Sequence, residues 1–163
     1  MKMSESVEWA AHCTVLLAML PDGSSLPASR LAEYHGVPGP YLAKSLQALM
    51  RAGIVESRAG RNGGYRLARP AHDISLLDVF EAIEGDGTFF RCTEIRRRGP
   101  SRVAAARYPP SCGIAGAMWE AEHRWRSSLE AVTVAGLAAG VAAQAPPEAV
   151  AKSVRWLATV RSS

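Results

Sequence analysis

Two cysteines in an irregular stretch are the residues of this sequence best placed for redox or metal chemistry. Cys92 and Cys112 have nineteen residues between them, and glycine and proline mark the segment 91–111 as a loop too long for an ordinary connector. Cys112 follows Pro110-Ser111 and opens the next expected helix. The helix dipole should therefore lower the pKa of its thiol and favour the thiolate that binds metal or reacts with oxidants. Two free thiols in a flexible loop would fit the same spacing.

A second candidate pair lies near the N-terminus, in a helix expected over about residues 6–20. Glu8 and His12 are four residues apart, so they point the same way and are spaced to share a ligand. The same spacing also suits an exposed helical pair. Cys13 is rotated away from both and has the character of a small buried hydrophobe. Trp9, beside Glu8, is most simply a core aromatic residue.

The element that must position these groups is the segment 36–70. A turn rich in proline and glycine leads into a helix that starts near Pro40 and ends at Gly53, with apolar residues at steps of three and four. A strand over 54–57, a glycine-rich loop over 60–64 and a returning strand over 65–67 follow. With a preceding helix over 26–34, the pattern predicts a winged helix-turn-helix.

The charge of this segment points to nucleic acid. Residues 38–70 hold six basic residues against Glu56 alone, in a chain whose net charge is +4. Phosphate is the expected counterpart, although a winged helix used only for protein contacts would keep the same pattern. The residues expected to enter the major groove or contact the backbone are Gly39, Tyr41, Lys44, Ser45, Gln47, Arg51, Arg58, Arg61 and Asn62.

The remaining pattern completes a mainly α fold with a small β-hairpin wing and a long dimerisation helix. An acidic helix over 75–84 connects the wing to the loop. One continuous helix is expected over 113–143, packing against its twin with Trp119 and Trp125 as candidate anchors, and an amphipathic helix over 148–160 ends the chain. This divides the chain into a DNA-binding domain (1–87), a loop that carries the cysteines (88–112) and a dimerisation and C-terminal unit (113–163).

Composition narrows the class of protein. The 163 residues, 48% of them hydrophobic, can bury a real core, and the basic pI near 9.3 agrees with nucleic-acid binding. Neither a signal peptide nor a membrane-spanning stretch is expected, and three cysteines, an odd number, favour a reducing cytoplasm over a disulfide framework. Serine, histidine and acidic residues form no recognisable catalytic spacing, so an enzyme is not expected.

Several short motifs resemble the IscR, NsrR and RsrR family of dimeric bacterial repressors. They are Leu31-Ala32-Glu33, Tyr41-Leu42-Ala43-Lys44, Arg51-Ala52-Gly53-Ile54-Val55, the wing Gly60-Arg61-Asn62-Gly63-Gly64-Tyr65, Leu67-Ala68-Arg69-Pro70 and Ile74-Ser75-Leu76-Leu77-Asp78-Val79. The resemblance covers residues 7 to about 140. It implies a homodimer on a partly palindromic DNA operator, often with an iron–sulfur cluster that sets DNA affinity.

The cysteine pattern is similar to the RsrR branch of that family, which has two loop cysteines where other cluster-binding relatives have three. The shared residues are Val7-Glu8-Trp9-Ala10, His12-Cys13, Cys92-Thr93-Glu94-Ile95-Arg96, Arg98-Gly99-Pro100 and Cys112. The resemblance implies a 2Fe-2S cluster held by Cys92 and Cys112 with Glu8 and His12 of the partner subunit, with Trp9 as a redox gate and Cys13 outside the site.

Three other interpretations stay open at this level. Two thiolates, one imidazole and one carboxylate also suit zinc. The same cysteines would serve a thiol sensor that holds no cluster. The chain would also fit an interaction module that dimerises through its long helix and no longer binds DNA.

Overall fold

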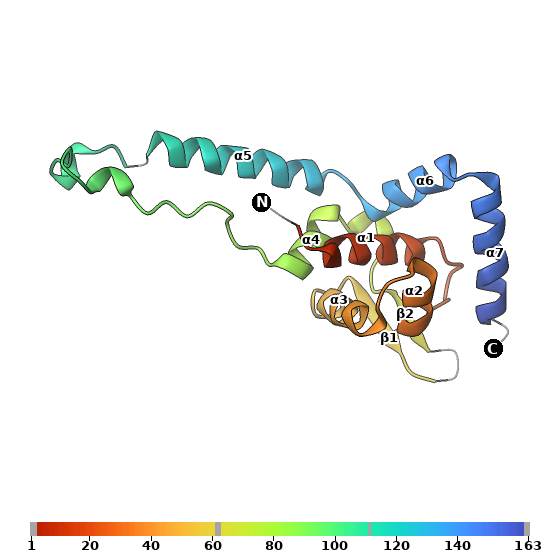
Figure 1. Ribbon diagram of the computed structural model, residues 1–163. Coiled ribbons are helices and arrows are strands. Elements are labelled where there is room, and N and C mark those ends of the chain that lie inside the picture. The colour runs from red at the N-terminus through yellow and green to blue at the C-terminus, as the bar shows by residue number, and fades with distance from the viewer. Residues whose placement is uncertain (1–2, 61–62, 111, 162–163) are drawn as a thin grey trace.

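A long arm leaves the helical body of the protein (Figure 1). The computed structural model describes residues 3–60, 63–110 and 112–161. The body contains α1 (Glu5–Ala18), α2 (Ala28–His35), α3 (Gly39–Arg51), β1 (Val55–Arg58), β2 (Gly64–Leu67), η1 (Ala71–Asp73), α4 (Leu76–Glu84), α6 (Val134–Gln144) and α7 (Pro147–Arg161). The arm contains η2 (Ile95–Arg97), η3 (Ala105–Arg107) and α5 (Gly113–Glu130). The predicted fold class, mainly helical with a two-stranded hairpin, is confirmed.

Helix α1 is the centre of the body, where α3, α4 and α6 pack around it. The inward face of α3 buries Leu42, Leu46 and Leu49 at helical spacing, all 0% exposed. Helix α2 meets α3 through a tight turn in which Gly36 has a φ of 65°, a conformation that glycine adopts at low cost. The helix-turn-helix expected from the sequence is therefore formed around one apolar core.

The wing is fixed to the body at its base. Strands β1 and β2 pair antiparallel, with Val55 opposite Leu67 and Arg58 opposite Gly64. Tyr65 also exchanges two backbone hydrogen bonds with Leu26, of 2.7 and 3.0 Å. A Cβ atom at Gly64 would lie 2.3 Å from the carbonyl carbon of Leu26, so only glycine permits this approach.

The prediction of one continuous helix over 113–143 is wrong, because a short non-helical segment separates α5 from α6. Strand-like pairing of Ser75 with Thr133 interrupts it: the Leu76 N–H donates to the Val132 carbonyl (2.7 Å) and the Val134 N–H to the Ile74 carbonyl (2.8 Å). The Thr133 side chain then caps α6 by accepting from the Gly136 N–H. The break lets α5 leave in the arm while α6 returns to α1.

The arm joins the body through an aromatic and ionic joint. Trp125 packs edge-on against Phe80 and Phe89, with ring centroids 4.9 and 5.1 Å away, so it serves the joint within one chain rather than a dimer interface. Arg126 bonds Glu81 of α4, the buried Glu122 and the backbone carbonyls of residues 86 and 87. These contacts fix the direction in which α5 leaves the body.

Helix α7 covers the outer side of α2. The Tyr34 and Ser153 hydroxyls lie 2.8 Å apart, the Trp156 indole N–H donates to Glu33 (3.2 Å), and the Tyr34 and Trp156 rings meet edge to face. In the part of the chain that the structure describes, no helix is long and apolar enough to span a bilayer.

Candidate DNA interface and cysteine site

The outer face of α3 carries the candidate base-reading residues. Tyr41 is 60% exposed, and the Lys44 ammonium lies 5.7 Å from the centre of its ring. Gln47 and Arg51 are exposed further along the same helix. A helix that offers an aromatic ring, an amide and two cations on one exposed face suits a major groove.

The structure contradicts one residue of the predicted DNA-binding set and does not describe two others. Ser45 is 3% exposed and lies on the inner face of α3, which removes its side chain from the candidate base contacts. Arg61 and Asn62 lie outside the described residues. Arg58, at the end of β1, is exposed next to the loop and keeps its place in the set.

Two arginines counted with this basic segment serve the fold. Arg66 forms an ion pair with Glu56 directly across the hairpin. Arg69 donates to the Asp73 carbonyl (2.6 Å) and pairs with the Asp78 carboxylate (3.2 Å), which joins the wing to the start of α4. The excess of positive charge available to phosphate is therefore smaller than the sequence count suggests.

The N-terminal candidate pair faces solvent on α1. Glu8 and His12 are both exposed, and Glu8 lines a groove of about 470 Å³ between α1, α4 and the end of α5. Trp9 is half-buried against the core and lines a neighbouring groove with Pro38 and Tyr41, at the start of the recognition helix. The helix that carries the candidate ligands therefore contacts the helix that carries the candidate base contacts.

His35, the last residue of α2, is a further candidate that the sequence does not single out. Its ring lies 5.8 Å from that of His12, and its Nε2 atom is buried with no hydrogen-bond partner among the described residues. Burial, followed by the neighbouring His12, lowers the pKa of His35 below its ordinary value of 6.5. Sequence periodicity within α1 and α2 does not predict the contact between His12 and His35, because this contact arises from the packing of the two helices.

The three cysteines have different environments. Cys13 is fully buried, and burial raises the pKa of its thiol to about 12, as suits a core residue. The Ala115 and Ile114 N–H groups at the start of α5 lower the pKa of Cys112, with a further contribution from Arg96. Cys92 is half-buried, and its sulfur lies 3.8 Å from a Glu94 carboxylate oxygen. The expected effect of the helix N-terminus on Cys112 is thus present.

The two candidate ligand pairs lie in different parts of one chain. Cys92 and Cys112 flank η2 and η3, which form the far end of the arm, whereas Glu8 and His12 belong to α1 in the body (Figure 1). Among the described residues, no three histidine, cysteine or acidic side chains gather as a metal site. As a donor set, two thiols, an imidazole and a carboxylate suit iron or zinc. These residues fit one metal centre only if the arm of one chain meets the body of another.

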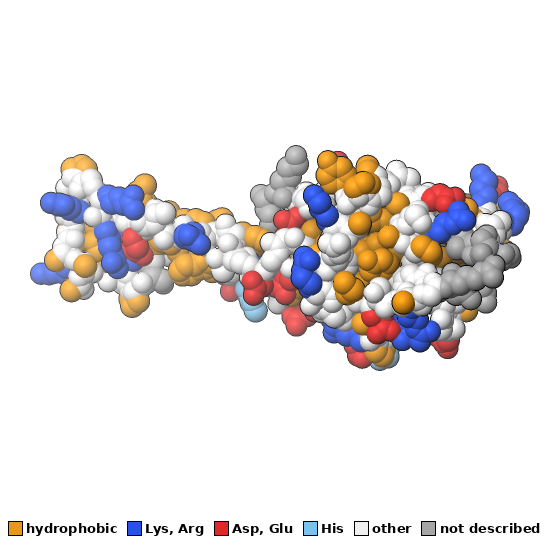
Figure 2. Space-filling model, turned by 90° about the horizontal axis from the view of Figure 1, so that it is seen from below, with side chains coloured by type: hydrophobic (Ala, Val, Ile, Leu, Met, Phe, Trp, Pro, Cys, Tyr) orange, Lys and Arg blue, Asp and Glu red, His pale blue; other side chains and the backbone are white. Residues whose placement is uncertain are grey.

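Charge and apolar exposure on the arm favour such a meeting. Residues 91–112 hold six arginines against one glutamate, and Figure 2 shows basic side chains gathered at the far end of the arm. The body segment 71–90, which follows the wing, holds five acidic residues and no lysine or arginine, although Asp78 and Glu81 already pair with Arg69 and Arg126. On α5, Ile114 is 70% exposed, Met118 46% and Trp119 42%. Exposed apolar residues of this size mark an interaction surface.

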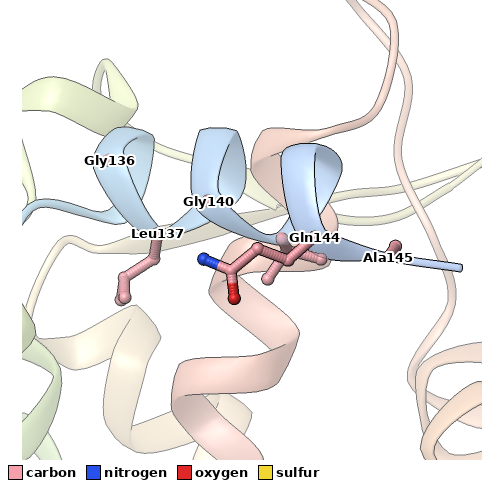
Figure 3. A pocket seen from close by; sticks show the side chains of 6 residues that line it. Gly136, Leu137, Gly140, Gln144 and Ala145 are labelled. Carbon is pink, nitrogen blue, oxygen red and sulfur yellow. The ribbon is translucent and has the colours of Figure 1, made fainter.

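A shallow hollow along α6 offers no comparable chemistry. It measures about 420 Å³, and Figure 3 shows its lining of small and apolar residues with the Gln144 amide beside them. No titratable residue lines it. The cysteine site and the α3 face are therefore the functional candidates.

Comparison with known proteins decides the family. The model of the Rrf2 family, described as iron-dependent transcriptional regulators, matches residues 3–140. This chain belongs to the Rrf2 family of transcriptional regulators. Its Rrf2 relatives carry regulator names and not enzyme names, as the sequence predicts.

Two curated relatives share most of their length with the chain. One, named as the HTH-type transcriptional regulator YffB of Lactococcus lactis, is 34% identical over 140 residues, which cover 85% of this chain and 87% of that protein. Another, named as the HTH-type transcriptional regulator Rv1287 of Mycobacterium tuberculosis, is 32% identical over 152 residues, or 93% and 88% of the two chains. DNA-binding regulation is therefore the shared function.

Solved structures of two Rrf2 regulators share the fold. CymR, the global cysteine regulator of B. subtilis, superposes with a TM-score of 0.68 at 19% identity, over 85% of this chain and 97% of CymR. IscR of T. potens gives a TM-score of 0.67 at 23% identity, over 90% and 93%. At these identities the likeness supports the winged-helix architecture.

Proposed function

We propose that this Rrf2 protein is a dimeric repressor in a bacterial cytoplasm whose affinity for its DNA operator is set by the redox state of a 2Fe-2S cluster. Cys92 and Cys112 of one subunit would hold the cluster together with Glu8 and His12 of the other. On this proposal the chain would be nearest to the RsrR branch of the family. The division into residues 1–87, 88–112 and 113–163 follows the same proposal.

The observation that carries this proposal is the separation of the two ligand pairs. Cys92 and Cys112 lie on an arm with an exposed apolar helix and a basic tip, and Glu8 and His12 lie exposed on α1, whose first turn carries Glu5 and Glu8. Burial of Ile114 and Met118 against a second copy would remove apolar surface from water. The same contact would complete a four-ligand site.

The residues of the site have separate tasks. When bound, a 2Fe-2S cluster gains or loses a single electron, and replacing thiolate ligands by imidazole raises its potential. The N–H groups at the start of α5 and Arg96 stabilise the Cys112 thiolate needed as a ligand. Glu8 and His12, one helical turn apart on α1, would present a carboxylate and an imidazole to the same centre.

The body offers a short route from the ligands to DNA. Helix α1 packs directly on α3, and Trp9 shares a groove with Pro38 and Tyr41. A change of ligand geometry at Glu8 and His12 would therefore act on the start of the recognition helix, with Trp9 as the gate. In a dimer it would also alter the spacing of the two recognition helices, which sets operator fit.

The test is an absorption spectrum with iron, sulfide and zinc analysis of protein purified without oxygen, before and after dithionite. We expect a brown protein with about two irons and two sulfides per cluster. It should bleach reversibly and bind operator DNA more weakly when reduced. Cys92→Ala and Cys112→Ala should lose the cluster, and normal iron and sulfide in either variant would refute the ligand assignment. Glu8→Ala should be milder.

A sensor without a cluster is the second candidate, and the lowered pKa of Cys112 favours it. Such a protein would be colourless, either with zinc in the same donor set or with a reactive thiol. Zinc at one per site, or oxidant-dependent loss of DNA binding in metal-free protein after failed reconstitution, would select it.

A further inference from the structure

Arg96 lies between the two segments of the arm that carry the cysteines. Its guanidinium donates to the Glu94 carboxylate (3.0 Å) on the Cys92 side and to the Pro109 carbonyl (2.8 Å) on the Cys112 side. The Tyr108 hydroxyl donates back to the Arg96 carbonyl (2.7 Å). Two hydrogen bonds in opposite directions therefore join Arg96 to residues 108–109.

The contacts around Arg96 are well suited to hold a fixed geometry. The guanidinium carbon lies 5.1 Å from the centre of the Tyr108 ring, and the arginine side chain is only 19% exposed on a largely exposed loop. A planar guanidinium that donates hydrogen bonds and stacks on an aromatic ring loses less conformational freedom than a lysine ammonium would. The loop thus gains a local core made of one arginine and one tyrosine.

Glu94 connects this core to the first cysteine. It is the one described non-glycine residue with a positive φ (52°), a conformation that costs free energy and persists where contacts hold it. Its carboxylate pairs with Arg96 and with Arg97, and it lies 3.8 Å from the Cys92 sulfur. The left-handed turn at Glu94 therefore sets where Cys92 lies relative to Arg96.

We propose that Arg96 is the positioning residue of the cysteine site: it clamps the Cys92 and Cys112 segments together. The proposal rests on the proposed function for its purpose, which is to present two thiolates to one cluster.

The clamp is tested on cluster-free, full-length protein with dibromobimane, which fluoresces when it bridges two nearby thiols. Cys13 is buried and should not react. We expect bridging within one chain between Cys92 and Cys112, and at least a fivefold lower rate in Arg96→Gln. Arg102→Gln is the matched control, since it removes an exposed arginine of the same loop but should leave the rate within twofold.

Two further variants separate the clamp from the charge. Tyr108→Phe removes the hydroxyl bond and keeps all charges, so bridging should fall. Arg96→Lys keeps the charge but cannot form the same fork, so bridging should stay low. Unchanged bridging in Arg96→Gln, or full recovery with lysine, would overturn the clamp.

The outcome of the bridging test is separable from that of the proposed function. A protein that never holds a cluster would refute the proposed function, while the bridging result still decides the clamp.

Discussion

The body and the arm of this Rrf2 regulator are stabilised by different kinds of contact. In the body, apolar residues from α1, α3, α4 and α6 meet in one core, and many are completely buried. In the arm, segment 91–112 relies on polar and cation–π contacts centred on Arg96 and Tyr108, while Ile114 and Met118 of α5 stay exposed. The body has the core of an independent fold, and the arm has a surface suited to a second chain.

This difference suits the proposed division of labour, in which the body reads DNA and the arm senses. A rigid body can hold α3 and the wing in register with DNA, which needs fixed side chains. A polar arm with few buried apolar contacts can change position at lower cost. The joint at Trp125 and Arg126 is where the two meet.

The largest expected effect is a core truncation in the body. Leu46 is completely buried in α3, so Leu46→Ala should lower the free energy of unfolding by about 2–5 kcal/mol, measured by urea denaturation. Gln47→Ala, on the exposed face of the same helix, is the control and should change it by less than about 0.5 kcal/mol. Equal effects would contradict the assignment of the two faces.

A charge on the exposed face of the arm should act on assembly instead of on the body. Ile114 is 70% exposed in one chain, so Ile114→Glu should leave the melting of the body nearly unchanged. If α5 packs against a second copy, the variant should weaken dimerisation at least about tenfold, or about 1.4 kcal/mol, in sedimentation experiments. Glu120→Gln, at another exposed position of α5, is the control. A dimer unaffected by Ile114→Glu would place the interface elsewhere.

The wing and the arm both carry exposed arginines, and DNA binding should distinguish them. Arg58→Ala, beside the wing loop, should weaken operator binding and reduce the slope of log affinity against log salt by about one. Arg107→Ala removes an exposed arginine from the arm and should change neither. Fluorescence anisotropy over a salt series measures both. A matching loss in Arg107→Ala would show that the arm also contacts phosphate.

A smaller, pH-dependent effect is expected at His35. Its folded pKa lies below the ordinary value of 6.5, so the unfolded chain binds a proton more readily. The contribution of neutral His35 to the free energy of unfolding is complete above about pH 6.5 and decreases as the pH falls below that value. His35→Gln should therefore flatten the dependence of unfolding free energy on pH between about 7 and 5. His72→Gln changes an exposed histidine, and a slope equal to wild type in both variants would contradict the assignment.

Much of the body was predictable because local patterns determined it. The three- and four-residue steps in α3 predicted its inner face, and Gly64 is needed where the wing approaches Leu26. Ser75 forms a capping box with Asp78 at the start of α4, and Cys112 precedes the first turn of α5. Apart from the approach of Gly64 to Leu26, each of these features depends on neighbours in sequence.

Only the tertiary structure decided the rest, because it depends on residues that meet from distant parts of the chain. The break before α6 follows from the pairing of Thr133 with Ser75, which no helical period records. Trp125 belongs to the aromatic joint because it packs against Phe80 and Phe89. Sequence spacing made Glu8 with His12, and Cys92 with Cys112, into candidate pairs. The arm separates the two pairs in one chain, so the proposed four-ligand site would need a second chain.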